Sequence, residues 1–155
     1  MGFIQRTDFS GRMDKSEEEA VIGQLTSVPL FSHLSGKDLK TVARSGTLRS
    51  YVAGDRIVTK GEKGLGFFLI LDGRVEVKRD GKVIATLAPG AFFGEMALFE
   101  ELPRTADVVA AAPSRCLVLT RWDFWGSMTR EPEVLRALIT EMARRLHETT
   151  KSLSE

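Results

Sequence analysis

The chain has almost no cysteine, since Cys116 is the only one among its 155 residues. A single thiol excludes a disulfide within the chain and a cluster of thiolates around a metal ion. Such scarcity is typical of proteins that function in a reducing compartment. We therefore expect a cytoplasmic protein whose fold is held together without covalent cross-links.

The chain also lacks an excess of charge and a long apolar stretch. Its 22 Lys and Arg residues against 21 Asp and Glu residues leave a net charge of +1, which is too little for long-range attraction to nucleic acid or to an anionic membrane. No apolar run approaches the roughly 20 residues that span a bilayer, and the N-terminus lacks the basic-then-apolar order of a secretory signal. We expect neither nucleic acid binding nor a membrane span.

Two helices are predicted near the N-terminus. Residues 1–16 are mostly polar, which is typical of a flexible leader. Ser16 is followed by three glutamates, the pattern of an N-cap with an acidic first turn, and this helix should end before Pro29. Ser35 opens a second predicted helix that ends near Gly46.

Residues 47–121 carry short apolar runs separated by turn signals about every eight to twelve residues. Val75 and Val77 alternate with polar residues, and the Asp80-Gly81 pair that follows is a strong signal for a two-residue hairpin turn. This spacing predicts an antiparallel sandwich or barrel. The expected strands are 56–60, 67–71, 75–79, 83–87, 107–111 and 116–120.

The pattern becomes helical again after residue 121. Residues 122–128 form a short predicted helix, and Pro132 opens a long one because proline is favoured at the first helical position. Residues 151–155 remain as a tail, so the folded domain is expected to cover 17–150. Spacings of three and four residues predict one buried apolar face on the long helix, made of Val134, Leu135, Leu138, Ile139, Met142 and Leu146.

One stretch carries the groups expected of a ligand site. Residues 93–106 read FGEMALFEELPRTA, with Glu95 directly after Gly94 and a single arginine, Arg104, nine residues beyond the glutamate. A phosphosugar needs an acceptor for its ribose hydroxyl, and a guanidinium with free backbone N–H groups for its phosphate. Glu95, Arg104 and the amides after Gly94 supply all of these.

Each of these residues also has a plainer structural interpretation. Gly94 and Glu95 suit the start of any helical turn, where the helix dipole favours a carboxylate. Arg104 suits a surface ion pair with Glu100 or Glu101. The whole string is more specific than its parts, and it strongly resembles the phosphate-binding cassette of the cyclic-nucleotide-binding domain family of nucleotide-gated channels, nucleotide-dependent kinases and catabolite-activator-type regulators.

This resemblance covers most of the chain and implies both a fold and a ligand. The family fold is mainly β with flanking helices: an eight-stranded antiparallel β-jelly roll with N-terminal helices and a long C-terminal lid helix. The implied ligand is a 3′,5′-cyclic purine nucleotide, cAMP or cGMP. Arg104 would bind the cyclic phosphate and Glu95 the ribose 2′-hydroxyl, while Gly94, Met96 and Ala97 would bring backbone amides close to the phosphate oxygens.

The resemblance assigns four further residues. Thr105 would reach the phosphate or the base, and it does not decide between cAMP and cGMP. Val77 and Leu87 would lie against the base, although both are equally explained as plain core. Arg145 would stack its flat guanidinium on the purine, although with the adjacent Arg144 it also suits a solvated helix end.

The expected function is that of a sensor, in which nucleotide binding moves the C-terminal helix and thereby acts on an effector protein or a homodimer partner. One alternative is a protein-interaction module that keeps the fold without a ligand, and the intact pair of Glu95 and Arg104 argues against it. A metal-dependent barrel enzyme is the other alternative. His33 and His147 are too far apart in sequence to predict a metal site, and no nucleophile and base stand together, so we expect no metal, no cofactor and no catalysis.

Overall fold

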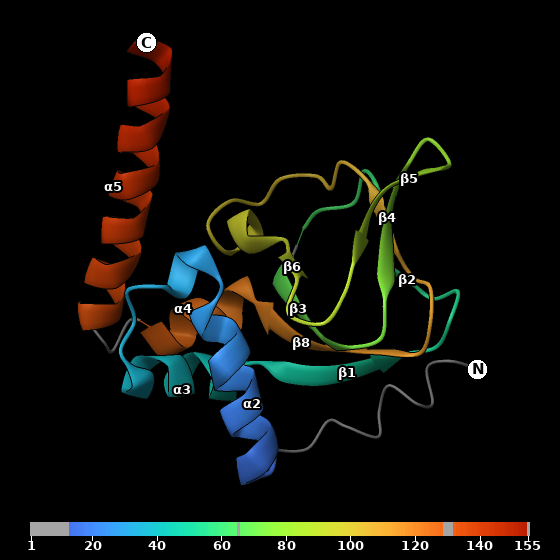
Figure 1. The fold of residues 1–155 in the computed structure, drawn as a ribbon, viewed down its shortest axis with the longest axis horizontal. Helices are drawn as coiled ribbons and strands as arrows, with labels where there is room; N and C mark the ends of the chain where they lie inside the picture. The colour runs from blue at the N-terminus through green and yellow to red at the C-terminus, as the bar shows by residue number, and fades with distance from the viewer. Residues whose placement is uncertain (1–12, 65, 129–131, 155) are drawn as a thin grey trace.

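Two antiparallel sheets form the centre of the fold, and helices pack at both ends of the chain (Figure 1). The computed structural model describes residues 13–64, 66–128 and 132–154, so most of the predicted leader, residues 1–12, lies outside it. Within these ranges eight strands form two four-stranded sheets, with the orders β1-β8-β3-β6 and β2-β7-β4-β5. This arrangement confirms the predicted eight-stranded antiparallel jelly roll with flanking helices.

The strands agree closely with the sequence prediction, except for two that it misses. The first sheet contains β1 (Thr47–Tyr51), β3 (Gly66–Asp72), β6 (Phe92–Phe93) and β8 (Ser114–Thr120). The second sheet contains β2 (Arg56–Val58), β4 (Val75–Arg79), β5 (Lys82–Leu87) and β7 (Asp107–Ala110). The apolar pattern does not predict β1, whose sequence TLRSY is mostly polar, or β6, which is only two residues long.

The first sheet is buried on both faces, which explains why β3 is almost entirely apolar and why the middle of β8 is a continuous apolar run. Successive side chains of a strand point to opposite faces. Phe67 and Leu69 of β3 belong to the core beneath the helices, whereas Phe68 and Ile70 belong to the core between the two sheets. β8 alternates in the same way, and its Cys116 faces the inner core, where burial raises the pKa of the thiol to about 12.

Polar caps set the start of the N-terminal helices. The elements are α2 (Lys15–Thr26), η1 (Pro29–Phe31) and α3 (Gly36–Ser45). The predicted cap of α3 is confirmed, because Ser35 Oγ accepts a hydrogen bond from the Asp38 N–H at 3.2 Å. The predicted cap at Ser16 is wrong: Asp14 Oδ1 accepts from the Glu17 N–H at 2.7 Å, and Ser16 already lies inside the helix.

The long C-terminal helix buries a narrower face than predicted. The last two helices are α4 (Arg121–Met128) and α5 (Pro132–Ser154), so the predicted tail continues α5 as far as residue 154. Figure 1 shows α5 at one side of the molecule, with its C-terminal end beyond the sheets. Val134 and Leu138 are buried as predicted, but Ile139 and Leu146 are each 68% exposed. The prediction is wrong at these two positions because α5 packs on η1 and α4 along a stripe that includes Glu141 instead.

Two glycine turns differ in how tightly the surrounding structure packs against them. In the hairpin between β4 and β5, Asp80 and Gly81 have φ values of 53° and 79°, which confirms the predicted two-residue turn. A Cβ at Gly81 would meet nothing within 4 Å. Gly73, between β3 and β4, has a φ of +92°, and a Cβ there would lie 2.3 Å from Ser114 Oγ and 2.4 Å from the Pro113 carbonyl oxygen.

We expect Gly73→Ala to lower the free energy of unfolding by about 3 kcal/mol, because the left-handed backbone and a steric clash act together. Gly81→Ala is the matched control with a similar φ but open space, and should cost about 1 kcal/mol. Denaturant unfolding of both variants measures the difference. Equal losses of stability would show that the contact with β8 does not constrain this turn.

Candidate functional site

The segment between β6 and β7 approaches β3 so closely that it requires glycine. Gly94 ends β6 with a φ of +81° and precedes the single 3₁₀ turn η2 (Glu95–Leu98). A Cβ at Gly94 would lie 2.5 Å from the Gly66 carbonyl oxygen and 2.6 Å from Arg104 Nη1. Glycine therefore serves both the positive φ and the close packing of backbone against the arginine. In this state the Ala97 N–H donates to the Gly94 carbonyl at 3.0 Å within the turn.

Arg104 lies just before β7, and its side chain packs closely against Gly64, Gly66 and Gly94. Its Nη2 donates to the Gly66 carbonyl at 2.7 Å, and a Cβ at Gly64 would come within 2.8 Å of its Nε. The guanidinium carbon lies 5.9 Å and 6.0 Å from the ring centres of Phe68 and Phe93, which stack on each other. Burial lowers the pKa of the Arg104 guanidinium. Its Nε is buried without a hydrogen-bond partner among the described residues.

The structure therefore does not support the plainer interpretation of Arg104 as a surface ion pair. Glu101, one of the two partners considered, lies instead 3.7 Å from Lys63 Nζ and 3.5 Å from Arg121 Nη2. Arg104 has no carboxylate partner among residues 13–64, 66–128 and 132–154. A half-buried guanidinium held by a single carbonyl retains most of its capacity to bind an anion.

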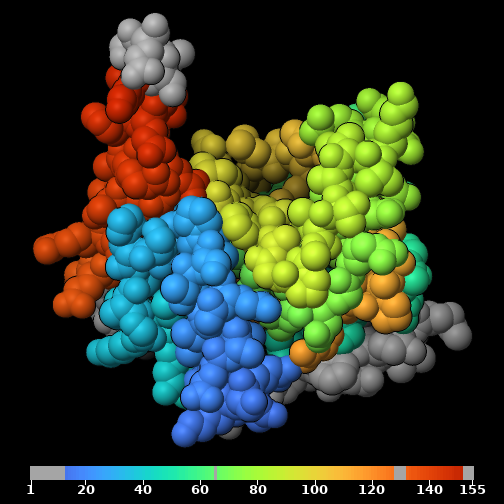
Figure 2. All heavy atoms as spheres, viewed as in Figure 1, coloured from blue at the N-terminus to red at the C-terminus, as the bar shows by residue number. Residues whose placement is uncertain are grey.

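Most of the predicted site residues line one cavity of about 270 Å³. Figure 2 shows the molecular surface hollowed between the β4–β5 hairpin and the segment around η2. The cavity also has Glu100, Leu102 and Pro103 in its wall. The predicted residues in its lining are Gly94, Glu95, Met96, Ala97, Arg104 and Thr105.

Val77 and Leu87 lie deeper in the fold than that lining. Both are partly buried and pack against the core between the two sheets, on the neighbouring strands β4 and β5. Neither side chain lines the cavity, so the structure shows them as core residues, and their contact with a base stays a prediction.

Arg145 connects α5 to the site, because its guanidinium forms an ion pair with Glu95. Its Nη1 lies 2.9 Å from Glu95 Oε1, and its Nη2 lies 3.4 Å from Glu95 Oε2. Its Nε donates to Glu141 at 2.9 Å. The hydrogen bond to Glu95 is the main reason that the pKa of Arg145 is raised. The predicted alternative of a solvated arginine therefore does not describe this side chain.

Glu141 is a buried acid that the sequence prediction missed. It is 1% exposed, and its carboxylate accepts from Arg144 at 2.8 and 3.0 Å and from Arg145 at 2.9 Å. His33 Nε2 lies 3.3 Å from the same carboxylate. The bond from Arg144 is the main reason that the pKa of Glu141 is lowered to about 2. The spacing of Glu141 three and four residues before two arginines is the signal that could have revealed it.

The described residues contain neither a cluster of metal-ligating side chains nor a membrane-spanning helix. Across residues 13–64, 66–128 and 132–154, no group of three or more His, Cys, Asp and Glu side chains could hold a metal ion. Among the same residues, no helix is long and apolar enough to cross a membrane.

Comparison with known proteins identifies the family. The sequence profile of the cyclic nucleotide-binding domain matches residues 48–131. The chain belongs to this family. It is 38% identical over 91 residues to a cAMP-dependent protein kinase regulatory subunit of Mycosarcoma maydis, a match that covers 56% of this chain and 17% of that protein. It is 36% identical over 122 residues to Glutaminase 2 of Bradyrhizobium diazoefficiens, a match that covers 76% of this chain and 19% of the relative.

A solved structure of similar size supports the same conclusion. The N-terminal domain of a transcriptional regulator from Streptomyces coelicolor A3(2) superimposes with a TM-score of 0.78 at 29% identity, covering 84% of this chain and 94% of that one. The domain of this family is a regulatory module. The chain spans only 17% and 19% of the two curated relatives, so their whole-protein activities do not transfer to it.

The lowered pKa of Glu141 predicts an acid-sensitive contribution to stability. Because this pKa lies below the unfolded value near 4.5, the contribution is present above that value and is lost as the pH falls toward about 2. We expect Glu141→Gln to have a lower free energy of unfolding than the wild type at neutral pH. The difference between the two proteins should become smaller as the pH falls from about 4.5 toward about 2. Thermal unfolding at a series of pH values measures it.

Glu148→Gln is the control for this experiment, because Glu148 is an exposed acid on α5 whose only ion pair among the described residues is with Arg144. Its difference from the wild type should change little over the same window. If the Glu141→Gln gap stays constant with pH, the buried carboxylate is not ionised in the way that its contacts imply.

Proposed function

We propose that this domain binds a 3′,5′-cyclic purine nucleotide, cAMP or cGMP, and acts as a sensor through α5. The observation that carries the proposal is that Arg104, Glu95 and the glycine-led turn η2 line a single cavity. These are the groups that a ribose cyclic phosphate requires: a guanidinium for the anion and an acceptor for the hydroxyl. Membership of the cyclic nucleotide-binding domain family supports the same ligand class.

Arg104 would pair with the cyclic phosphate. Two unit charges about 4 Å apart attract by roughly 4 kcal/mol at an effective dielectric near 20, before desolvation costs. The structure reduces those costs, because the guanidinium is already partly desolvated and fixed by the Gly66 carbonyl. Little side-chain entropy then remains to be lost on binding.

Glu95 would accept a hydrogen bond from the ribose 2′-hydroxyl while Arg145 holds its carboxylate. A nucleotide that occupies the cavity would therefore contact a side chain that is bonded directly to α5. The purine would extend toward Val77 and Leu87 and stack beneath Arg145. Thr105 is exposed in the cavity wall and does not distinguish the two purines, so both remain candidate ligands.

The output of the sensor would be the position of α5. A ligand shifts such an equilibrium only by its differential affinity for the two states, and moving it from 1% to 99% takes about 5.5 kcal/mol. The proposed role is regulatory and non-catalytic, in the cytoplasm, with an effector protein or a second copy of the chain as the partner. The ligand-free interaction module is the weaker candidate, because it offers no reason to bury the Nε of Arg104 without a partner.

We expect Arg104→Ala to weaken cAMP or cGMP binding by about 2–5 kcal/mol, because the phosphate would be left without its counter-charge. Isothermal titration with both cyclic nucleotides, and with linear AMP and GMP for comparison, measures the loss and identifies the base preference. Arg136→Ala is the control, since Arg136 is an exposed arginine of α5 outside the cavity. Equal affinity of Arg104→Ala and the wild type would rule out this site.

We also expect amide hydrogen exchange over residues 134–146 to slow when the cyclic nucleotide is bound, because the closed position of α5 would be favoured. In Arg145→Ala this slowing should be reduced, since the link from Glu95 to α5 is absent. Mass spectrometry of exchange with and without nucleotide tests both points. Unchanged exchange in a nucleotide-saturated wild type would mean that α5 is not the moving element.

A further inference from the structure

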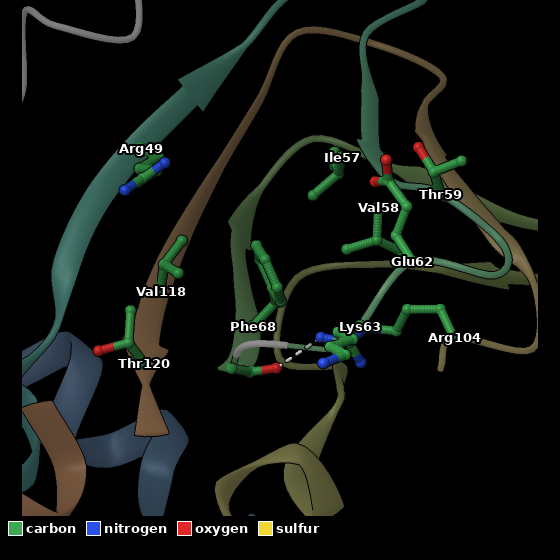
Figure 3. Close-up of a pocket in the computed structure, with 11 residues that line it drawn as sticks. Arg49, Ile57, Val58, Thr59, Glu62, Lys63, Phe68, Arg104, Val118 and Thr120 are labelled. Atoms are coloured by element: carbon green, nitrogen blue, oxygen red, sulfur yellow. Dashed lines mark hydrogen bonds between the residues drawn. The ribbon is translucent and has the colours of Figure 1, made fainter. Parts of the chain in front are cut away.

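A second cavity, of about 220 Å³, lies at the edge of the sandwich where β1 faces β2 (Figure 3). Its walls come from β1, β2, β3 and β8 and from the segment after β2. Arg104 is the predicted site residue that lines this cavity as well as the first one. The two cavities are therefore separate spaces that share one guanidinium.

The charged groups around this second cavity favour an anion. Arg49, Lys63 and Arg104 line it, against the single carboxylate of Glu62. Arg49 is exposed on β1 and forms no ion pair with any described residue. The pair of Lys63 with Glu101 is long, at 3.7 Å, and both side chains are exposed, so it competes weakly with an incoming anion.

The unpaired Nε atom of Arg104 also favours an anionic ligand. Its Nη2 is used by the Gly66 carbonyl, but its Nε is buried and has no partner among the described residues. A buried donor without an acceptor is rare in folded proteins and is costly. An anion in a cavity that Arg104 lines would remove this cost by drawing the side chain away from Gly64, so that Nε gains an acceptor.

The rest of the lining is apolar and sets the shape of the ligand. Ile57 and Val58 of β2 face Phe68 of β3 and Val118 of β8 across the cavity (Figure 3). A water molecule takes about 30 Å³ of liquid volume, so the space equals about seven waters. An inorganic anion would gain nothing from the apolar walls, whereas an organic anion would bury its apolar part against them.

We propose that this cavity is a second binding site, for a small organic monocarboxylate with a compact apolar body. The carboxylate lies toward Lys63 and Arg104, and the apolar body packs on Val58, Phe68 and Val118. Arg49 adds its positive charge from the far side of Phe68 and Val118 (Figure 3). Arg104 also lines the first cavity. An anion bound in one cavity therefore changes how strongly the Arg104 guanidinium attracts an anion in the other. The two sites are thereby coupled, and such coupling is reciprocal.

The test uses benzoate as the probe, with the whole chain and no nucleotide present, followed by amide resonances in two-dimensional NMR. We expect saturable shifts at Val58, Phe68 and Val118, with a dissociation constant in the millimolar range that a ligand of this size allows. Arg49→Gln should weaken binding by about tenfold, which corresponds to about 1.4 kcal/mol. Benzamide, the neutral analogue of similar shape, should bind to the wild type more weakly than benzoate by a similar factor.

Arg56→Gln is the matched control, because Arg56 is also an exposed arginine in a neighbouring strand but does not line the cavity. It should bind benzoate like the wild type. The proposal is overturned if benzoate leaves these resonances unmoved, if both arginine variants bind equally, or if inorganic phosphate produces the same shifts. Since nucleotide is absent, a failure of cyclic nucleotide binding at the first cavity would leave this result unaffected.

Discussion

The hydrogen bond from Arg104 to the Gly66 carbonyl is the contact on which the candidate site depends. It brings a positive charge into the fold with no carboxylate beside it among the described residues, and the surrounding chain is shaped to allow this. Side chains at Gly64 or Gly94 would occupy the space of the guanidinium itself. A buried charge is costly unless it is compensated. The backbone therefore fixes the position of the Arg104 guanidinium. An anionic ligand would complement its charge.

The backbone can hold this position because the first sheet is packed on both faces. β3 supplies the Gly66 carbonyl and Phe68, and it lies between the helix-covered core and the core inside the sandwich. A strand fixed from both sides has little freedom to move its carbonyl when a ligand arrives. On the other side of the site, η2 is bonded to helices instead of to a sheet. Trp125 Nε1 of α4 donates to the Leu98 carbonyl at 2.6 Å, and Arg145 of α5 donates to Glu95.

The sequence predicted the fold well because its strongest signals are local. The hairpin at Asp80-Gly81, the cap at Ser35 and the proline that opens α5 each depend on a few adjacent residues. The predicted site residues from Gly94 to Thr105 line one cavity, since they lie in one continuous segment, and their contact with a ligand stays a prediction. The pair between Arg145 and Glu95 joins positions 50 residues apart, and no local pattern encodes such a contact.

The role of Glu141 went unpredicted for a different reason: its spacing from Arg144 and Arg145 is local, but that spacing does not show that the acid is buried. This acid connects the site to the rest of the molecule. An acidic side chain on a helix is expected to be solvated, yet Glu141 lies within the buried stripe of α5, among apolar residues. Its carboxylate orients Arg145, and Arg145 in turn holds Glu95. On the opposite side it meets His33, which follows η1. Breaking the bond between Glu95 and Arg145 therefore leaves Arg145 still tied to a buried acid, so α5 and the N-terminal helices would move together rather than as independent parts.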